Sequence, residues 1–176
     1  MIVQNTTIKD CKHISPYVFY DFRGEYVETY NKQEYDKLFP IGVSSEFVQD
    51  DFSLSEKYTL RGFHGDEKTW KLVQAKIGTI ILIVIDVRKE SSTYGVHQGF
   101  LLNERNRQQI LVPSNCAIAH LCLSDCCMFD YKQTEYYDRD IQFSYNYKSN
   151  GVVWPIPDNK LILSDRDRNA PLWTKE

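Results

Sequence analysis

Residues 77–87 read IGTIILIVIDV, and this stretch bears on the fold class more than any other. Gly78, Thr79 and Asp86 interrupt it, and it is well short of the roughly 18 apolar residues that a membrane helix needs. We therefore interpret it as a buried β-strand. Every position from Ile80 to Ile85 is apolar, so both faces of the strand need cover, one from the core and one from a second sheet or a partner subunit. We accordingly expect a homodimer.

Short runs of β-branched and aromatic residues recur along the chain, separated by turn signals. Twelve Tyr, nine Phe and three Trp make 14% of the residues aromatic, a composition typical of an all-β sandwich or barrel. The predicted strands are Lys71 to Ala75, Thr79 to Val87, Gln98 to Leu102, Gln108 to Val112, Ala117 to Leu123, Met128 to Thr134 and Ile141 to Tyr147.

The last predicted strand alternates apolar and polar residues, so one of its faces should be buried and the other exposed to solvent. Only Asn31 to Phe39, which Pro40 stops, looks helical. The tail from Gly151 onward is rich in Pro and Asp, and we expect it to be an extended segment that covers the rest of the domain.

Length and charge limit the classes of function. The 176 residues suit one domain, 1–176, with a single core. Twenty-one Lys and Arg against 24 Asp and Glu give a net charge of -3, which offers no basic surface for nucleic acid or an anionic membrane. The N-terminus lacks the charged start and continuous apolar stretch of a secretory signal, so we expect a cytoplasmic protein. The sequence has no glycine-rich phosphate loop, so a nucleotide would have to be held by individual side chains.

The cysteines indicate a reducing compartment. Five is an odd number, and Cys126 and Cys127 are adjacent, which makes a poor disulfide framework. Cys116, His120, Cys122 and Cys126 are spaced by even numbers and would share one face of a straight strand, a pattern that leaves a metal site open. Zinc ligands usually come together from paired short loops, and free cysteines are commonly small buried hydrophobic residues. We therefore expect no metal.

Residues 59–73, TLRGFHGDEKTWKLV, carry polar groups suited to chemistry. On a regular strand Arg61 and His64 would face opposite sides, because they are an odd number of residues apart. Gly62 is where a bulge could re-aim one of them toward the other. The alternative interpretation is a strand-end turn with an exposed arginine and a hydrogen-bonded histidine.

Two further places hold candidate catalytic groups. Tyr131 lies on a predicted strand with polar neighbours, and Asp165 and Asp167 lie in LSDRDRNAP near the C-terminus. A carboxylate can fix the tautomer of a histidine base, and a lysine ammonium can stabilise a developing enolate oxygen. The alternatives are an aromatic core residue and a solvated charge run, and periodicity alone does not bring these residues together.

Five segments, taken together, resemble one known family. They are FVQDDFSLSEKYTLRGFHGD, KLVQAKIGTI with VIDVRKESSTYGV, VPSNCAIAHLCLSD, YKQTEYYD, and VVWP with LILSDRDRNAPLW. In order and spacing they resemble the dTDP-4-dehydrorhamnose 3,5-epimerase family, from about YDFRGEYVE at position 20 to the end of the chain.

The resemblance implies a cupin-type jelly roll that works as a homodimer without a metal or other cofactor. It also implies a reaction, epimerisation beside the 4-keto group of a nucleotide-diphosphate-linked 6-deoxy sugar. The ketone acidifies the hydrogens on C3 and C5, a base removes one of them, the enolate is held, and a proton returns to the opposite face.

By the same resemblance, His64 matches the base of the family, and Asp167 matches the acid that orients it. Lys71 matches the lysine near the sugar 4-oxygen, and Tyr131 matches the tyrosine that supplies a proton from the other side. Positions that match those binding the substrate, its nucleotide and phosphates are Arg23, Glu28, Gln49, Arg61 and His120. Arginine forks suit a diphosphate.

The sequence also departs from the familiar family pattern. Phe63 stands where R-G-L-H has leucine, the GDEKTW loop is short, and A-H-G-F becomes AHLC. The short loop resembles family variants that act on GDP-linked 4-keto-6-deoxy heptoses in the synthesis of bacterial capsular and other surface polysaccharides. Some relatives invert only C3. Two other function classes remain, a non-catalytic jelly-roll module that binds a sugar nucleotide and a metal-dependent cupin enzyme.

Overall fold

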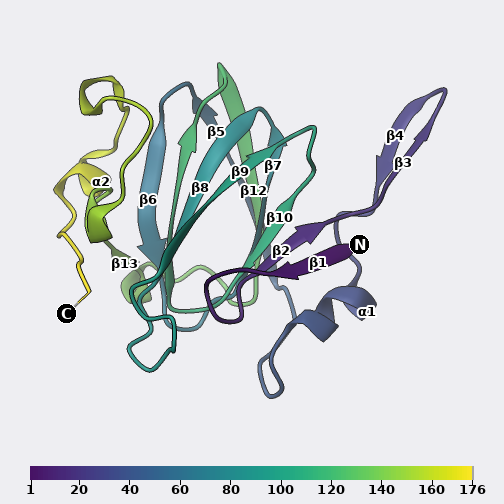
Figure 1. Cartoon of the computed structure of the whole chain (residues 1–176), viewed down its shortest axis with the longest axis horizontal. Helices are drawn as coiled ribbons and strands as arrows, with labels where there is room; N and C mark the ends of the chain where they lie inside the picture. Colours follow the sequence, from purple (N-terminus) through teal and green to yellow (C-terminus); the bar gives the residue numbers. More distant parts are fainter. Residues whose placement is uncertain (176) are drawn as a thin grey trace.

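The computed structural model describes residues 1–175, and two antiparallel sheets account for most of its strands (Figure 1). The first sheet has the strand order β1 (Ile2–Asn5), β2 (Lys12–Ser15), β10 (Gln109–Val112), β7 (Lys71–Ile77), β12 (Cys126–Gln133) and β5 (Gln49–Glu56). The second has the order β13 (Phe143–Ser144), β6 (Leu60–Gly65), β11 (Cys116–Cys122), β8 (Thr79–Asp86) and β9 (His97–Asn103). The all-β prediction is confirmed, and the arrangement is a cupin-type jelly roll.

Strand β8 is buried on both faces, as its continuous apolar run predicts. Ile80, Leu82 and Val84 face the first sheet and belong to the core between the two sheets. Ile83 and Ile85 point to the other face and pack in a second core. The second core is closed by the chain's own C-terminal segment, through Tyr147, Val152, Trp154 and Leu161, and not by a further sheet or a partner subunit as expected.

The predicted strand from Ile141 to Tyr147 is wrong, since only Phe143–Ser144 is a strand. Tyr145 still exchanges two backbone hydrogen bonds with Phe63 of β6, and the residues beyond this pairing make other hydrogen bonds. Arg139–Ile141 is a 3₁₀ turn, and the Asn146 backbone N–H donates to the Pro171 carbonyl. The aromatic side chains of this segment therefore cover the second sheet from a short pairing with β6, and not from a strand that runs the full length of the segment.

The helical prediction for Asn31 to Phe39 is confirmed in place, as α1 (Lys32–Tyr35) followed by a 3₁₀ turn, Asp36–Leu38. The Asn31 side chain caps α1 by accepting from the Gln33 N–H. The C-terminal tail is not simply extended. It contains 3₁₀ turns at Ser149–Gly151 and Asp158–Lys160 and the short helix α2 (Asp165–Asn169).

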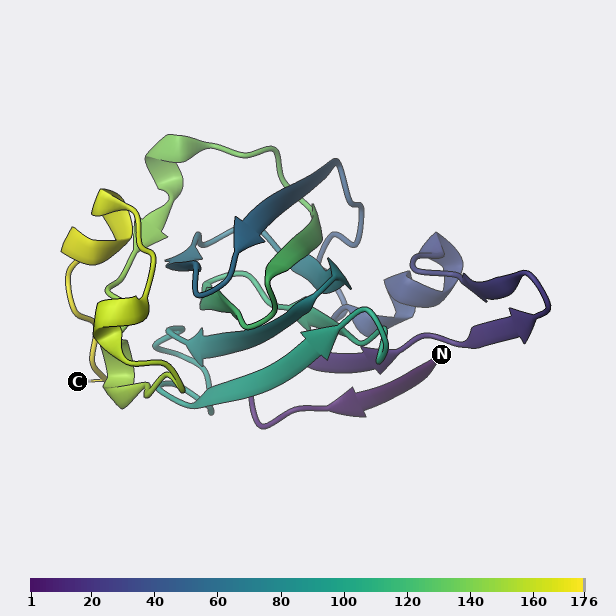
Figure 2. The same ribbon diagram turned by 90° about the horizontal axis from the view of Figure 1, so that it is seen from above.

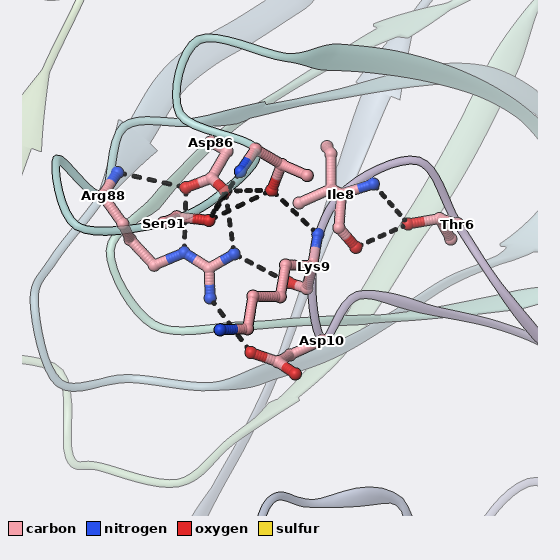
Figure 3. Close-up of polar contacts among 8 residues, drawn as sticks. Thr6, Ile8, Lys9, Asp10, Asp86, Arg88 and Ser91 are labelled. Carbon is pink, nitrogen blue, oxygen red and sulfur yellow. Dashed lines mark hydrogen bonds and ion pairs between the residues drawn. The ribbon is translucent and has the colours of Figure 1, made fainter.

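The loop after β8 is fixed by a buried carboxylate (Figure 3). Asp86 accepts from the Arg88 guanidinium at 2.8 Å, and from the Ser91 and Thr93 hydroxyls at 2.6 Å each. Arg88 in turn donates to the Lys9 carbonyl at 2.7 Å. This network joins the end of β8 to the turn between β1 and β2, and so ties the two sheets together at one end.

The hairpin of β3 (Val18–Asp21) and β4 (Gly24–Val27) projects away from both sheets, at the end opposite the C-terminal segment (Figures 1 and 2). We call it the arm. Its aromatic residues, Phe19, Tyr20, Phe22 and Tyr26, are exposed, with Phe22 98% accessible. Within residues 1–175, no helix is long and apolar enough to cross a membrane.

Candidate active site

A cavity of about 340 Å³ opens between the two sheets, beside α2. Its walls are Arg61 and His64 of β6, Ile118 and His120 of β11, Ser53 of β5, Lys71 of β7, Phe129 and Tyr131 of β12, and Ser164, Arg166 and Asp167 at α2. Six of the nine predicted site residues therefore meet here, although they come from five separate segments of the chain. They are His64, Lys71, Tyr131, Asp167, Arg61 and His120.

A bulge at Gly62 brings Arg61 and His64 to the same side of β6. Ile118 pairs with His64, but His120, two residues on, pairs with Arg61, so β6 has one residue more than its partner strand. Gly62 has φ of +120°, and a Cβ there would lie 2.4 Å from the Ile118 carbonyl oxygen. The interpretation of Gly62 as a bulge is confirmed, and only glycine fits this position.

His64 and Asp167 form a hydrogen-bonded pair, with 2.6 Å between Nε2 and Oδ1. The His64 side chain is 30% exposed toward the cavity, and that of Asp167 is only 5% exposed. Asp167 also accepts from the Gly62 N–H, and its own N–H donates to the Ser164 hydroxyl that caps α2. Burial raises the pKa of Asp167, but the His64 hydrogen bond and charge, with Ser164 and Gly62, outweigh it and keep that pKa below its ordinary value.

Lys71 and Tyr131 lie on the opposite wall, with the Lys71 ammonium 5.8 Å from the centre of the Tyr131 ring. Burial lowers the pKa of Lys71, while the charges of Asp66 and Asp51 partly oppose this effect. Burial, with the nearby Asp51 and Tyr137, raises the pKa of Tyr131 to about 12. The tyrosine therefore keeps its proton at neutral pH, and the lysine gives up its proton more readily than an exposed lysine does.

His120 of β11 and Arg61 of β6 complete the second sheet's contribution to the cavity. His120 stacks on Phe129, with 4.0 Å between ring centroids, and burial with the charges of Arg61 and His64 lowers its pKa to about 3. It is therefore neutral, and its Nε2 is buried without a hydrogen-bond partner among residues 1–175. The Arg61 Nε donates to the Ser55 hydroxyl at 3.0 Å, which aims the guanidinium at the cavity.

Three predicted binding residues lie outside this cavity. Gln49 donates to Asp51 at 2.8 Å and accepts from the Tyr137 N–H at 2.9 Å. Arg23 lies on the arm, paired with Asp21, and Glu28 lies at the base of the arm. Within one chain, the structure does not bring Arg23 or Glu28 to the cavity.

The wall residues that were not predicted from the sequence include Arg166 and Ser53. Arg166 lies between Asp165 and Asp167, and its Nε donates to the Ser144 hydroxyl. The mixed charges of SDRDR suggested a solvent-exposed charged segment, so nothing in the sequence assigned Arg166 to the site. The Ser53 hydroxyl is buried and has no partner within the described chain. The alternation of DFSLSE, with Phe52 and Leu54 facing solvent, was the signal that Ser53 faces inward.

The cysteine pattern does not assemble on one face. Cys116 and Cys122 are buried on β11, whereas Cys126 is exposed at the start of β12. Among residues 1–175, no three His, Cys, Asp or Glu side chains are grouped closely enough to hold a metal ion.

Solved structures with the same fold point to one class of enzyme. The dTDP-4-dehydrorhamnose 3,5-epimerase of Elizabethkingia anophelis superposes with a TM-score of 0.91 at 34% identity, over 98% of this chain and 96% of that one. The dTDP-6-deoxy-D-glucose-3,5-epimerase of Legionella pneumophila, solved with dTDP-4-keto-L-rhamnose, superposes with a TM-score of 0.90 at 33% identity, over 97% and 92%. The fold and its cavity thus define a jelly-roll isomerase of the sugar-nucleotide epimerase class.

The sequence comparisons identify the family. The family model described as dTDP-4-dehydrorhamnose 3,5-epimerase matches residues 5–175. The Salmonella typhimurium enzyme of that name is 38% identical over 180 residues, which covers 98% of this chain and 95% of the relative. The chain belongs to the dTDP-4-dehydrorhamnose 3,5-epimerase family.

Proposed function

We propose that this chain inverts C3, and C5 where both centres react, of a nucleotide-diphosphate-linked 4-keto-6-deoxy sugar, with His64 as the base and Tyr131 as the opposing acid. The observation that carries the proposal is that these two groups come from facing sheets. His64, on β6, is paired with Asp167, and Tyr131, on β12, stands across the same cavity. A sugar ring between them can lose a proton to one wall and regain one from the other.

The first step is proton removal from the carbon beside the ketone. Asp167 accepts from the Nε2–H of His64, so the other ring nitrogen, Nδ1, takes the proton. The carboxylate then stabilises the imidazolium that forms, because its low pKa keeps it ionised. The negative charge moves from carbon to the sugar 4-oxygen as an enolate.

Lys71 is the group proposed to hold that oxygen. Its ammonium is buried, so its attraction for the enolate is little weakened by water. Tyr131 then returns a proton to carbon from the opposite face. Its raised pKa keeps the phenol protonated until the enolate takes the proton.

Arg61 is proposed to bind the diphosphate, because it is the guanidinium that faces the cavity from the bulged strand. The neutral His120 and the Ser53 hydroxyl have unpaired polar atoms in the same cavity, which suits hydrogen bonding to sugar hydroxyls. No step of this scheme passes through a metal or an organic cofactor.

Incubation with a nucleotide-linked 4-keto-6-deoxy sugar in heavy water tests the proposal. We expect deuterium at C3 by NMR, and at C5 if both centres react, and we expect His64→Ala to abolish it. Two substrates are compared, one linked to dTDP and one to GDP. The Legionella relative binds a dTDP-linked sugar, which supports dTDP, whereas the short GDEKTW loop is the reason to include the GDP-linked heptose. Absence of exchange with both would refute the proposal.

We further propose that the working unit is a homodimer in which the arm completes the partner's site. The arm projects away from the sheets of its own chain (Figure 2), exposes a cluster of aromatic side chains and carries Arg23 between β3 and β4. Exposed apolar clusters of this kind mark protein interfaces. A second copy would cover these rings and receive Arg23 and Glu28 at its nucleotide site.

Mixed dimers test the arm directly. His64→Ala disables the cavity and Arg23→Ala disables the arm, so a dimer with one of each has one site with both groups intact if the arm acts on the partner. A refolded equal mixture should recover about a quarter of the wild-type sites. If each arm served its own cavity, no activity would return in the mixture. A protein that light scattering shows to be a monomer would also give no activity in the mixture, and would refute the homodimer.

A further inference from the structure

The five-residue connection Asp66–Trp70 crosses from one sheet to the other. It leaves β6, which carries His64, and enters β7 at Lys71. The two groups proposed to remove the proton and to hold the enolate thus lie on different sheets. Their spacing across the cavity depends on the shape of this connection, because it is the shortest covalent path between them.

Asp66, the first residue after β6, organises the connection. Its Oδ1 accepts from the backbone N–H groups of Lys68 at 2.9 Å and Thr69 at 2.7 Å. Its Oδ2 accepts from the Gln142 side chain at 2.8 Å, which ties the connection to the segment after β12. The residue is only 2% exposed. Such a fully bonded, buried carboxylate holds a loop in one conformation.

The other end of the connection is also fixed. Trp70 is buried against Phe39, with 5.0 Å between ring centroids, and its backbone N–H donates to the Thr134 hydroxyl. Asp66 is therefore the polar anchor of a connection whose apolar anchor is Trp70. Loss of the polar anchor would free Lys68 and Thr69 while Trp70 stayed in place.

Asp66 also acts on Lys71 through its charge. The carboxylates that face the Lys71 ammonium are Asp66 from the connection and Asp51 from β5, and each favours its charged form. Tyr131 from β12 lies beneath the ammonium, and His64 and Arg61 from β6 line the same cavity. Of the two carboxylates, Asp66 has the larger effect on the pKa of Lys71.

We propose that Asp66 is a positioning residue for the epimerisation, which sets the location of Lys71 relative to His64 and keeps the Lys71 ammonium charged. This inference rests on the proposed function. The carboxylate works through two routes, the hydrogen bonds to the connection and the field at the ammonium. Two substitutions separate these routes.

Asp66→Asn keeps an oxygen for the Lys68 and Thr69 N–H groups, and Gln142 can turn its amide to accept from the new NH₂. Asp66→Asn therefore retains the shape of the connection and removes the negative charge at position 66. We expect kcat to fall about tenfold with little change in KM, and the alkaline limb of the kcat profile to move to lower pH. The shift follows because removal of a negative charge lowers the pKa of Lys71, which then loses its proton earlier as the pH rises.

Asp66→Ala removes the anchor as well as the charge, and we expect about a hundredfold loss of kcat/KM. Glu67→Gln is the matched control, with the same charge change in the same connection at an exposed position. It should leave both kcat and the pH profile as in the wild type. Circular dichroism and thermal melting check that each variant is folded.

The pKa of Lys71 is also measured without substrate, by NMR titration of protein labelled with ¹³C at lysine Cε and assigned with Lys71→Arg. Asp66→Asn should lower that pKa and Glu67→Gln should not. If Asp66→Asn matches the control in both the titration and the kcat profile, the inference is overturned while the epimerase proposal stands. If the wild type catalyses no exchange, the epimerase proposal fails, and the titration still decides whether Asp66 governs Lys71.

Discussion

The His64–Asp167 pair leads to a prediction of defined size. Asp167→Asn replaces the carboxylate by a neutral amide of almost the same shape, in a position where the residue is only 3% exposed. The Ser164 cap of α2 uses the Asp167 backbone N–H and can persist. The single amide oxygen can still accept from the His64 Nε2–H, so that only the weak 3.5 Å contact with the Gly62 N–H is lost. The change therefore removes charge and leaves the fold.

The expected loss follows from the 2.6 Å bond between the His64 Nε2 and Asp167. When His64 takes the substrate proton, that bond joins a cation to an anion, and bonds to charged groups contribute about 1.5–3 kcal/mol. Each 1.36 kcal/mol of barrier is about tenfold in rate. The loss in kcat should thus be about 10- to 150-fold, with KM nearly unchanged, because the pair strengthens only as the proton moves.

The assay is the rate of deuterium incorporation at C3, measured by NMR over a range of substrate concentrations. Asp165→Asn is the control, because Asp165 lies on the same helix but is exposed. A loss of less than about threefold for Asp167→Asn, or a loss confined to KM, would refute the role given to the pair.

Three further predictions concern other residues. Tyr131→Phe should keep deuterium exchange at C3 in the starting sugar but lose at least about tenfold in the rate of epimer formation, because the enolate forms without its opposing proton donor; NMR distinguishes the two stereoisomers. Asp86→Ala should lower the free energy of unfolding by about 3 kcal/mol, measured by urea titration, because the largely buried Arg88 loses its nearer carboxylate and keeps only Asp10 at 3.6 Å, and the Ser91 and Thr93 hydroxyls lose their acceptor. Asp66, Asp86 and Asp167 all have a pKa below the ordinary value in the folded protein, so each contributes stability that is complete above the unfolded pKa of about 4. Thermal melts should therefore change little between neutral pH and about pH 5 and then fall as the pH drops below about 4, and a melting temperature that held steady at low pH would contradict this.

Local sequence patterns predicted the central strands well and the edges poorly. The run from Ile80 to Ile85 identified β8, because only burial on both faces tolerates six apolar residues in succession. The strands β1 to β5 were not predicted. Strands β1 to β4 are only four residues long, and the side chains of β1, β3 and β4 are largely exposed. The alternation of apolar and polar residues from Ile141 to Tyr147 predicted too long a strand. Such alternation indicates which side chains are buried, but not which backbone groups pair.

The residues of the site divide in the same way. The family resemblance named His64, Lys71, Tyr131 and Asp167 from short motifs, without any means of judging whether they meet. The bulge at Gly62 was foreseen as an option, but only the register between β6 and β11 establishes it. Arg166 could not be separated from a solvated charge run until α2 was seen against the cavity.

The sequence by itself determined that this is an all-β member of a known enzyme family and which side chains are candidates for chemistry, because residue types and their local periodicity are written along the chain. Only the tertiary structure decided that six separate segments line one cavity, that His64 and Tyr131 face each other from different sheets, and that Asp66 anchors the connection between those sheets. The physical reason is that sheet order, register and the path of a connection arise from contacts between residues far apart in sequence, which no local pattern contains.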